Sequence, residues 1–236
     1  MALPKINESP KYKVTIPSMK REVFYRPFYV KEQKILLMAM ESQDQELILK
    51  AMVDTISSCL EEDINPNSLT TFDVEYIFTK IRSKSAGESA NIILSCKECK
   101  ADNEVSVNLE EIPAPEVHKI EDVVLNDKYT LKLRYPRYNH MLESLQKEEK
   151  VTATGLILDL AMASLDKLLT EDESITFDDE TDEEKTQFID NLNSDQFKKI
   201  MTFVEELPKL SKAVKFNCEK CKHENDYTLQ GIQDFF

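Results

Sequence analysis

The sequence predicts an α+β fold that is mostly helical, with an N-terminal β-hairpin and two further β-hairpins that each carry a Cys-x-x-Cys turn. The main observation is a repeat: residues 92–103 and 214–225 carry Cys, Cys, Lys and Asn at the same offsets. An apolar strand pattern precedes each copy, and a polar or alternating pattern follows it. Elsewhere, most apolar residues recur at helical spacing, which predicts amphipathic helices.

Residues 1–30 are expected to contain the N-terminal β-hairpin. Tyr12, Val14 and Ile16 alternate with polar residues, Pro17 begins a turn, and a second apolar run follows. Residues 31–88 are expected to be helical, because apolar side chains recur at helical spacing over 31–40, 44–60 and 70–84. Cys59 falls on the apolar face of the second of these helices, where we expect a small buried hydrophobic residue.

The rest of the chain is expected to alternate between the two cysteine hairpins and helices. The first Cys hairpin is placed at residues 89–112, and a connector with one strand, 129–133, at residues 113–137. Residues 138–208 are expected to be helical, with helices over 138–146 and 151–167 and two more after residue 181. The second Cys hairpin takes residues 209–236. Because hairpins that meet would tie both halves of the chain together, we expect one interlocked domain.

The acidic stretch 171–184 is expected to be a solvated loop that ends at a helix start. Thr181 and Glu184 have the spacing of a capping box. Hard cations also bind several carboxylate oxygens, but the stretch lacks the pattern of an EF-hand loop. The sequence therefore favours a loop over a cation site.

Composition limits the classes of function. The chain has 236 residues, only three glycines and a net charge of −14. Scarce glycine argues against glycine-rich phosphate loops, and the acidic balance argues against nucleic-acid binding. No apolar run is long enough for a membrane span, and the N-terminus lacks the pattern of a signal peptide. We therefore expect a protein that is intracellular when it is made, in a compartment where paired cysteines bind metal more often than they form disulfides.

The four paired cysteines predict a structural zinc site. One Cys-x-x-Cys turn supplies two thiolates, and two turns supply the four ligands of a tetrahedral, zinc-ribbon-like site. About 118 residues separate the pairs, but the entropy of loop closure grows only with the logarithm of length. His223 is the main competing ligand, whereas His118 and His140 have no partner pattern. The predicted ligands are Cys96, Cys99, Cys218 and Cys221.

Two other interpretations of the cysteines remain open: that they bind nothing, and that they form a redox pair. A thioredoxin-like pair places its first cysteine at a helix N-terminus, where the dipole lowers the thiol pKa. Strand patterns flank both pairs here, which disfavours that chemistry. No nucleophile and base form a catalytic set, so we expect no enzymatic activity.

Several stretches outside the cysteine pairs resemble a known family. They read Ile-Pro-Ser at 16–18, Tyr-Arg-Pro-Phe-Tyr-Val-Lys-Glu-Gln-Lys-Ile-Leu-Leu at 25–37, Thr-Phe-Asp-Val-Glu-Tyr-Ile-Phe at 71–78 and Ile-Arg-Ser-Lys-Ser at 81–85. The chain thereby resembles the T4-like bacteriophage baseplate hub assembly proteins, most closely over residues 1–112. The resemblance implies a late phage protein that helps build the central hub of the baseplate, as a chaperone or minor hub component. It also implies baseplate hub proteins as partners, and the host cytoplasm during assembly or the virion baseplate as location.

The basic, aromatic N-terminal hairpin is the candidate partner-binding surface. Interfaces between proteins are enriched in aromatic residues and arginine. The alternative is that these aromatic side chains cover the first helices. The residues of this candidate surface are Tyr12, Phe24, Tyr25, Arg26, Phe28 and Tyr29.

Two other function classes remain as alternatives. A zinc-ribbon regulator that binds nucleic acid would show salt-sensitive binding to DNA or RNA. The lysines beside the knuckles support it locally, but acidic residues accompany each of them. A thiol oxidoreductase would lose its activity on replacement of Cys96 or Cys218 by Ser.

Overall fold

The computed structural model describes residues 9–146 and 153–235. Where the sequence predicts one interlocked domain, the chain divides into two compact units. Unit 1 comprises Met1–Pro66, Phe72–Glu116 and Lys209–Phe236, and unit 2 comprises Asn67–Thr71 and Val117–Pro208. Each unit is therefore assembled from segments that are distant in the sequence.

Unit 1 begins with the predicted N-terminal hairpin. Strands β1 (Tyr12–Ile16) and β2 (Arg21–Tyr25) pair antiparallel, with Tyr12 opposite Tyr25. Every second side chain is buried, as the alternating pattern requires. The buried side chains are Val14, Ile16, Val23 and Tyr25.

Three α-helices follow, close to their predicted positions: α1 (Val30–Ser42), α2 (Gln45–Cys59) and α3 (Thr71–Ser85). The carboxylate of Asp44 accepts hydrogen bonds from the N–H groups of Glu46 and Leu47, which caps α2. Cys59 at the end of α2 is 1% exposed. This burial confirms its expected role as a small core residue.

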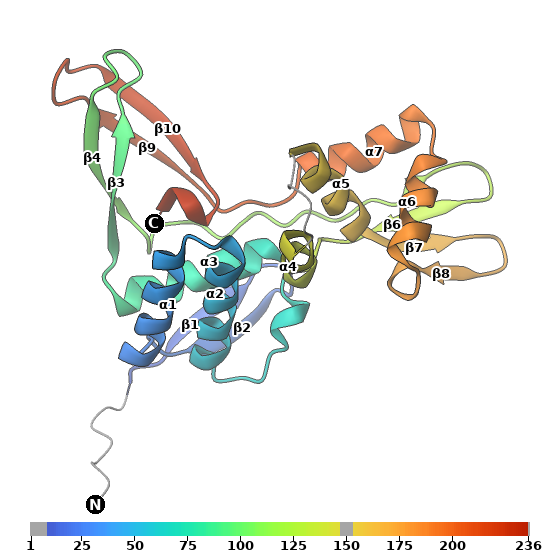
Figure 1. The fold of residues 1–236 in the computed structure, drawn as a ribbon, viewed down its shortest axis with the longest axis horizontal. Helices are drawn as coiled ribbons and strands as arrows, with labels where there is room; N and C mark the ends of the chain where they lie inside the picture. Colours follow the sequence, from blue (N-terminus) through green and yellow to red (C-terminus); the bar gives the residue numbers. More distant parts are fainter. Residues whose placement is uncertain (1–8, 147–152, 236) are drawn as a thin grey trace, which may run out of the picture. The chain divides into compact units, whose positions relative to one another are not determined.

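The two Cys hairpins also belong to unit 1. The first pairs β3 (Ser89–Ser95) with β4 (Asp102–Asn108), and the second pairs β9 (Ser211–Asn217) with β10 (Glu224–Gln230). A short 3₁₀ helix, η3 (Ile232–Phe235), follows β10. In Figure 1 the two hairpins, green and red, come together at their turns.

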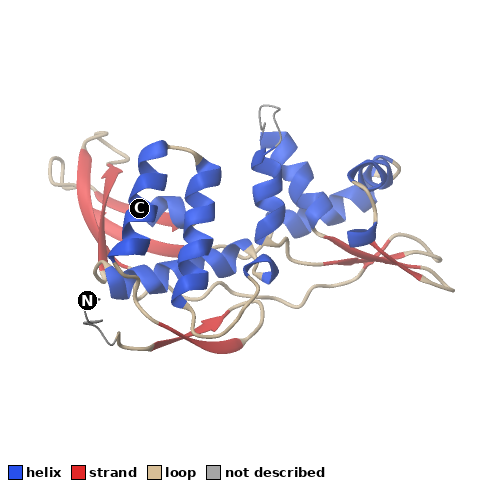
Figure 2. Ribbon diagram, turned by 60° about the horizontal axis from the view of Figure 1, so that its bottom comes forward, coloured by secondary structure: helices blue, strands red, loops and turns tan. Residues whose placement is uncertain are grey.

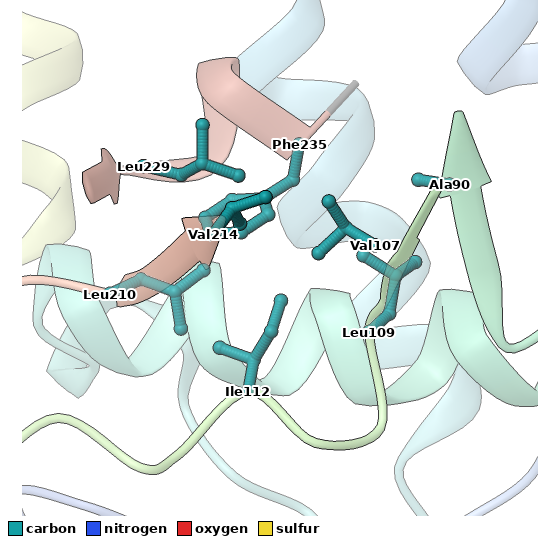
Figure 3. Packing of buried hydrophobic residues seen from close by; sticks show 8 residues of the cluster. All are labelled: Ala90, Val107, Leu109, Ile112, Leu210, Val214, Leu229 and Phe235. Atoms are coloured by element: carbon teal, nitrogen blue, oxygen red, sulfur yellow. The ribbon is translucent and has the colours of Figure 1, made fainter. Parts of the chain in front are cut away.

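One hydrophobic cluster joins the bases of the two hairpins. Figure 3 shows side chains of the first hairpin and the chain after it gathered with those of the second hairpin and η3. Burial of this apolar surface favours the paired arrangement over separate hairpins. The cluster consists of Ala90, Val107, Leu109, Ile112, Leu210, Val214, Leu229 and Phe235.

Unit 2 is built on a four-stranded antiparallel sheet in the order β5-β6-β7-β8. Its strands are β5 (Val123–Val124), β6 (Thr130–Leu133), β7 (Leu165–Leu169) and β8 (Ser174–Thr176). Its helices are α4 (Tyr138–Gln146), α5 (Ala153–Ala163), α6 (Asp182–Asp190) and α7 (Ser194–Glu205). Figure 2 distinguishes these strands, in red, from the blue helices. The buried core side chains are Val123, Leu131, Leu133, Ala161, Leu165, Phe177, Ile200 and Val204.

The prediction of a helical region over 138–208 is wrong for its middle part. The helix expected over 151–167 ends at Ala163, and its last residues enter β7, which pairs with β6; residues 151 and 152 lie outside the described part. The sheet buries Leu165 completely, so pairing with β6 outweighs the helical spacing of the leucines. The expectation of a mostly helical chain is accordingly not confirmed.

The acidic stretch 171–184 also contains more structure than expected. Strand β8 and a 3₁₀ turn, η2 (Phe177–Asp179), lie within it, and Phe177 is 4% exposed. The predicted capping box is confirmed, because Thr181 accepts from the N–H of Glu184 and the Glu184 carboxylate accepts from the N–H of Thr181. No helix within the described residues is both long and apolar enough to cross a membrane.

Candidate metal centre

The two Cys hairpins have the same length and the same strand register. Ser89 lies opposite Asn108 in the first hairpin, and Ser211 lies opposite Gln230 in the second. The Cys-x-x-Cys turn, or knuckle, therefore follows its first strand at the same distance in both. Because the two hairpins are equal in length and share one hydrophobic cluster at their bases, their two knuckles lie at the same distance from that cluster.

The two knuckles have the same backbone conformation. Lys100 and Lys222 take left-handed conformations, with φ of 58° and 61°. In the first knuckle, the Cys96 N–H donates to the Ala101 carbonyl at 2.8 Å and the Lys100 N–H to the Cys96 carbonyl at 3.0 Å. In the second, the Cys218 N–H donates to His223 at 2.9 Å and the Lys222 N–H to Cys218 at 2.9 Å. Each turn thereby directs both of its sulfurs to one side.

The four sulfurs form one cluster, as predicted. All of them lie within 4.8 Å of one another. The Sγ atoms of Cys96 and Cys221 are 3.7 Å apart, and those of Cys99 and Cys218 are 3.6 Å apart. In a tetrahedron of thiolates about 2.3 Å from a metal ion, neighbouring sulfurs lie about 3.8 Å apart. Four thiols in this arrangement can hold one metal ion.

Hydrogen bonds favour the thiolate form of the first cysteine in each knuckle. Burial opposes ionisation of Cys96, but bonds from the N–H groups of Cys99 and Glu98 outweigh it and lower the pKa to about 6. The pKa of Cys218 is also lowered, chiefly by the N–H of Cys221. These are the deprotonated ligands that a metal ion requires.

Cys221 shows the opposite shift. The backbone N–H of His223 favours its thiolate, but desolvation and the neighbouring sulfurs oppose ionisation more strongly, so its pKa rises to about 12. Crowded thiolates repel one another. A cation among them removes that repulsion, so metal binding at this cluster displaces protons.

None of the three histidines belongs to the group of potential metal ligands found among the described residues. Within the described residues, the four cysteines are the group of potential ligands that comes together. His223 contributes its backbone carbonyl to the second knuckle. In unit 2, His118 lines a groove of about 590 Å³, and His140 lies 3.8 Å from the carboxylate of Glu143.

The candidate partner surface on the N-terminal hairpin is only partly exposed. Phe24 is 39% exposed, whereas Tyr25 is 3% exposed and cannot face a partner in this structure. The guanidinium of Arg26 lies 4.2 Å from the Tyr29 ring centroid and donates to Glu32 and the Ser58 carbonyl. Tyr12 packs against Tyr25 with ring centroids 5.7 Å apart, and Phe28 is half-buried. Phe24 is thus the most accessible aromatic residue of the six.

Two asparagines at the site were not assigned a role from the sequence. Asn103 and Asn225 are buried between the knuckles, and each bonds to the opposite knuckle. The signal was present, because both occur seven positions after the first cysteine of their copy. A recurrence in two copies does not by itself show whether a residue faces its own turn or the other one.

Comparison of the chain with models of known protein families gives a match over nearly its whole length. The model of the family described as T4 bacteriophage base plate protein matches residues 9–236. The chain belongs to this family. The match confirms the resemblance to T4-like baseplate proteins, which is closest over residues 1–112, and covers nearly the whole chain. No curated protein and no solved structure matches it.

Proposed function

We propose that this base plate protein helps to assemble the central hub of the phage baseplate through protein–protein contacts, without enzymatic activity. The observation that carries the proposal is the family match over residues 9–236. The protein acts as a chaperone or a minor hub component, in the host cytoplasm during assembly or in the finished baseplate. Its partners are hub proteins.

We further propose that the four cysteines hold one structural zinc ion. Four thiolates in a tetrahedron suit zinc, and they leave no open position for a substrate. Iron can also occupy a site with four sulfur ligands. A colourless protein with about one equivalent of zinc supports the proposal, whereas iron with visible absorption contradicts it.

Solvent-exposed apolar side chains on α1 support a role in protein contacts. Buried side chains of this helix include Leu36 and Ala39, yet several large apolar side chains point to solvent. Contiguous exposed apolar surface is typical of sites that bind other proteins. The exposed residues are Val30 at 65%, Ile35 at 52%, Leu37 at 52%, Met38 at 70% and Met40 at 50%. These side chains and, separately, Phe24 are the partner contacts that we propose.

The hub-binding proposal is tested by coexpression with the phage's hub proteins, followed by size-exclusion chromatography of the purified mixture. The wild-type chain is expected to elute with a hub protein. Met38→Glu should weaken that complex at least about 10-fold, because it puts a charge into an apolar contact. Val124→Glu, at a side chain of unit 2 that is 57% exposed, is the control and should leave the complex intact.

A wild-type chain that bound none of the hub proteins would contradict the proposal. Equal weakening by Met38→Glu and Val124→Glu would remove α1 from the proposed surface. Circular dichroism of both variants shows whether the fold is retained.

The structure gives no support to the nucleic-acid alternative. The Lys97 ammonium already lies over the Tyr227 ring, Lys215 pairs with Asp226, and the net charge of the chain is −14.

A further inference from the structure

We infer that Asn103 and Asn225 form a reciprocal lock between the two knuckles, which positions the four thiols before a metal ion binds. The inference rests on the proposed metal-binding role of the cysteines and adds two positioning residues to it. Neither asparagine is a ligand. Each acts by fixing the position and orientation of the opposite knuckle, so that the four sulfurs lie close together.

Two hydrogen bonds of equal length cross between the hairpins. The N–H of Lys97, in the first knuckle, donates to Oδ1 of Asn225 at 2.8 Å. The N–H of Glu219, in the second knuckle, donates to Oδ1 of Asn103 at 2.8 Å. Lys97 and Glu219 each follow the first cysteine of their copy, so the two bonds are related by the same pseudo-twofold symmetry as the cysteines.

Each asparagine also supports its own knuckle. Nδ2 of Asn103 donates to the Ala101 carbonyl at 2.8 Å, and Nδ2 of Asn225 donates to the His223 carbonyl at 3.0 Å. Those carbonyls are the same ones that accept from the N–H groups of Cys96 and Cys218. Each asparagine amide therefore couples the conformation of its own knuckle to the position of the opposite knuckle.

Burial leaves little freedom to these amides. Asn225 is 0% exposed and Asn103 is 3% exposed. A buried amide without partners is costly, so its donors and acceptor must be satisfied within the protein. A side chain that presents one acceptor and two donors at this reach is Asn; Asp lacks the donors and Gln is one methylene longer. This requirement explains why Asn recurs in both copies.

The two amides differ in one contact. The second Nδ2 hydrogen of Asn225 points to Sγ of Cys96 at 3.5 Å, whereas Asn103 has the Leu94 carbonyl at 3.5 Å instead. Asn225 therefore touches a ligand atom directly, and Asn103 acts only through the backbone. An experiment can therefore distinguish an effect on the ligand sulfur itself, expected only for Asn225, from an effect on the knuckle backbone, expected for both asparagines.

The experiment replaces each asparagine by alanine in the full chain and measures metal affinity by competition with a chromophoric chelator. Asn103→Ala and Asn225→Ala are each expected to lower zinc affinity about 10- to 100-fold, the range typical of groups that orient metal ligands. Asn91→Ala is the matched control, because Asn91 is an exposed residue of β3 whose amide bonds only to Glu104 among the described contacts. It should leave the affinity within about 2-fold of the wild type.

Cobalt(II) supplies a spectroscopic test. With cobalt at saturation, all three variants should keep the absorption of a four-thiolate site. The sulfur-to-cobalt charge-transfer band should shift only in Asn225→Ala, since only that variant loses a hydrogen bond to a ligand sulfur. A general loss of hairpin stability would not produce that difference.

Hydrogen exchange in the metal-free, reduced protein tests the lock itself. The amide protons of Lys97 and Glu219 should exchange slowly in the wild type. Asn225→Ala should accelerate exchange at Lys97, and Asn103→Ala at Glu219, with little change at mid-strand amides. The inference is overturned if both amides exchange as fast in the wild type as in the variants, or if both variants keep wild-type affinity. A wild-type chain that binds no metal contradicts the proposed zinc site instead, and the exchange rates still test the lock.

Discussion

At the scale of single residues, the site depends on four sulfurs whose chemistry differs by position. The first cysteine of each knuckle is buried and has a lowered pKa, whereas Cys221 is exposed and has a raised pKa. A metal ion needs all four as thiolates. Loss of any one sulfur should therefore remove most of the affinity, whichever knuckle it belongs to.

Replacing a single cysteine tests this expectation. Cys96→Ser or Cys221→Ser should release zinc and destabilise the protein by about 3 kcal/mol, which corresponds to a fall of about 6–12 °C in Tm for a chain of this size. Elemental analysis and thermal unfolding measure the two effects. Cys59→Ala is the control: it creates a small cavity in α2 and should lower Tm while the full zinc content remains.

A partly buried carboxyl in α3 predicts a pH dependence. The Glu75 carboxyl accepts backbone N–H bonds from Ile232 and Leu210, but burial dominates and raises its pKa. A raised pKa in the folded state means that Glu75 contributes stability below its unfolded pKa of about 4.3, and that this contribution is lost as pH rises through the folded pKa. Glu75→Gln stays neutral, so its Tm relative to the wild type should increase between pH 5 and pH 8.

Thermal unfolding of both proteins across that pH range makes the comparison. Glu88→Gln is a suitable control, because the Glu88 carboxylate is exposed and pairs with Lys84. A Tm difference between Glu75→Gln and the wild type that falls as pH rises would contradict the assignment of a raised pKa to Glu75.

At the scale of elements, unit 1 is held by bonds between segments far apart in the chain. Asp73 in the first turn of α3 is 0% exposed. Its carboxylate accepts from the N–H of Ser18 at 2.9 Å and from the Ser18 hydroxyl at 2.5 Å. These bonds tie the turn of the N-terminal hairpin to the start of α3, where the helix dipole also favours a negative charge.

Substitution of Asp73 measures the strength of this connection. Asp73→Ala should destabilise the protein by about 2–3 kcal/mol, because it leaves the partly buried N–H and hydroxyl of Ser18 without their acceptor. Ser18→Ala keeps the backbone bond and should cost about half as much. Urea unfolding gives both values, and equal costs for the two variants would contradict a role for the Ser18 N–H.

The sequence predicts a helix or strand correctly when the pattern that specifies it lies within a short stretch of the chain. The Cys hairpins, the β1–β2 hairpin and the helices α1 to α3 were predicted because alternation, helical spacing and a repeat lie within short windows. Strand β7 was missed because its leucines also fit helical spacing, and only pairing with β6, some 35 residues earlier, decides the outcome. The cross-knuckle bonds of Asn103 and Asn225 were missed for the same reason, since no local pattern shows which hairpin an amide faces.

At the scale of the whole molecule, the cysteine cluster joins two segments of unit 1 that are far apart in the sequence, Phe72–Glu116 and Lys209–Phe236. The first knuckle precedes residues 117–208, the longer segment of unit 2, and the second knuckle follows them. A metal ion bound to all four sulfurs would link these two segments of unit 1. The proposed contact with hub proteins involves other residues of unit 1, namely the exposed apolar side chains of α1 and Phe24.

Removal of the metal should therefore affect unit 1 more than unit 2. With a strong chelator under reducing conditions, amide exchange should become faster in the residues of β3, β4, β9 and β10 that lie next to the knuckles. It should stay unchanged in β6 and β7. Hydrogen exchange with mass spectrometry resolves these segments. A uniform increase over both units would contradict the assignment of the metal to unit 1 alone.

The most direct test of the account is X-ray absorption spectroscopy of the purified, zinc-loaded protein. Two hairpins from distant parts of the chain bring four cysteine sulfurs within 4.8 Å of one another, and the account requires that one zinc ion bind all four. The predicted result is about one zinc per chain with four sulfur neighbours at about 2.3 Å. A protein prepared with ample zinc that holds none, or a zinc ion with nitrogen or oxygen among its nearest neighbours, would contradict it.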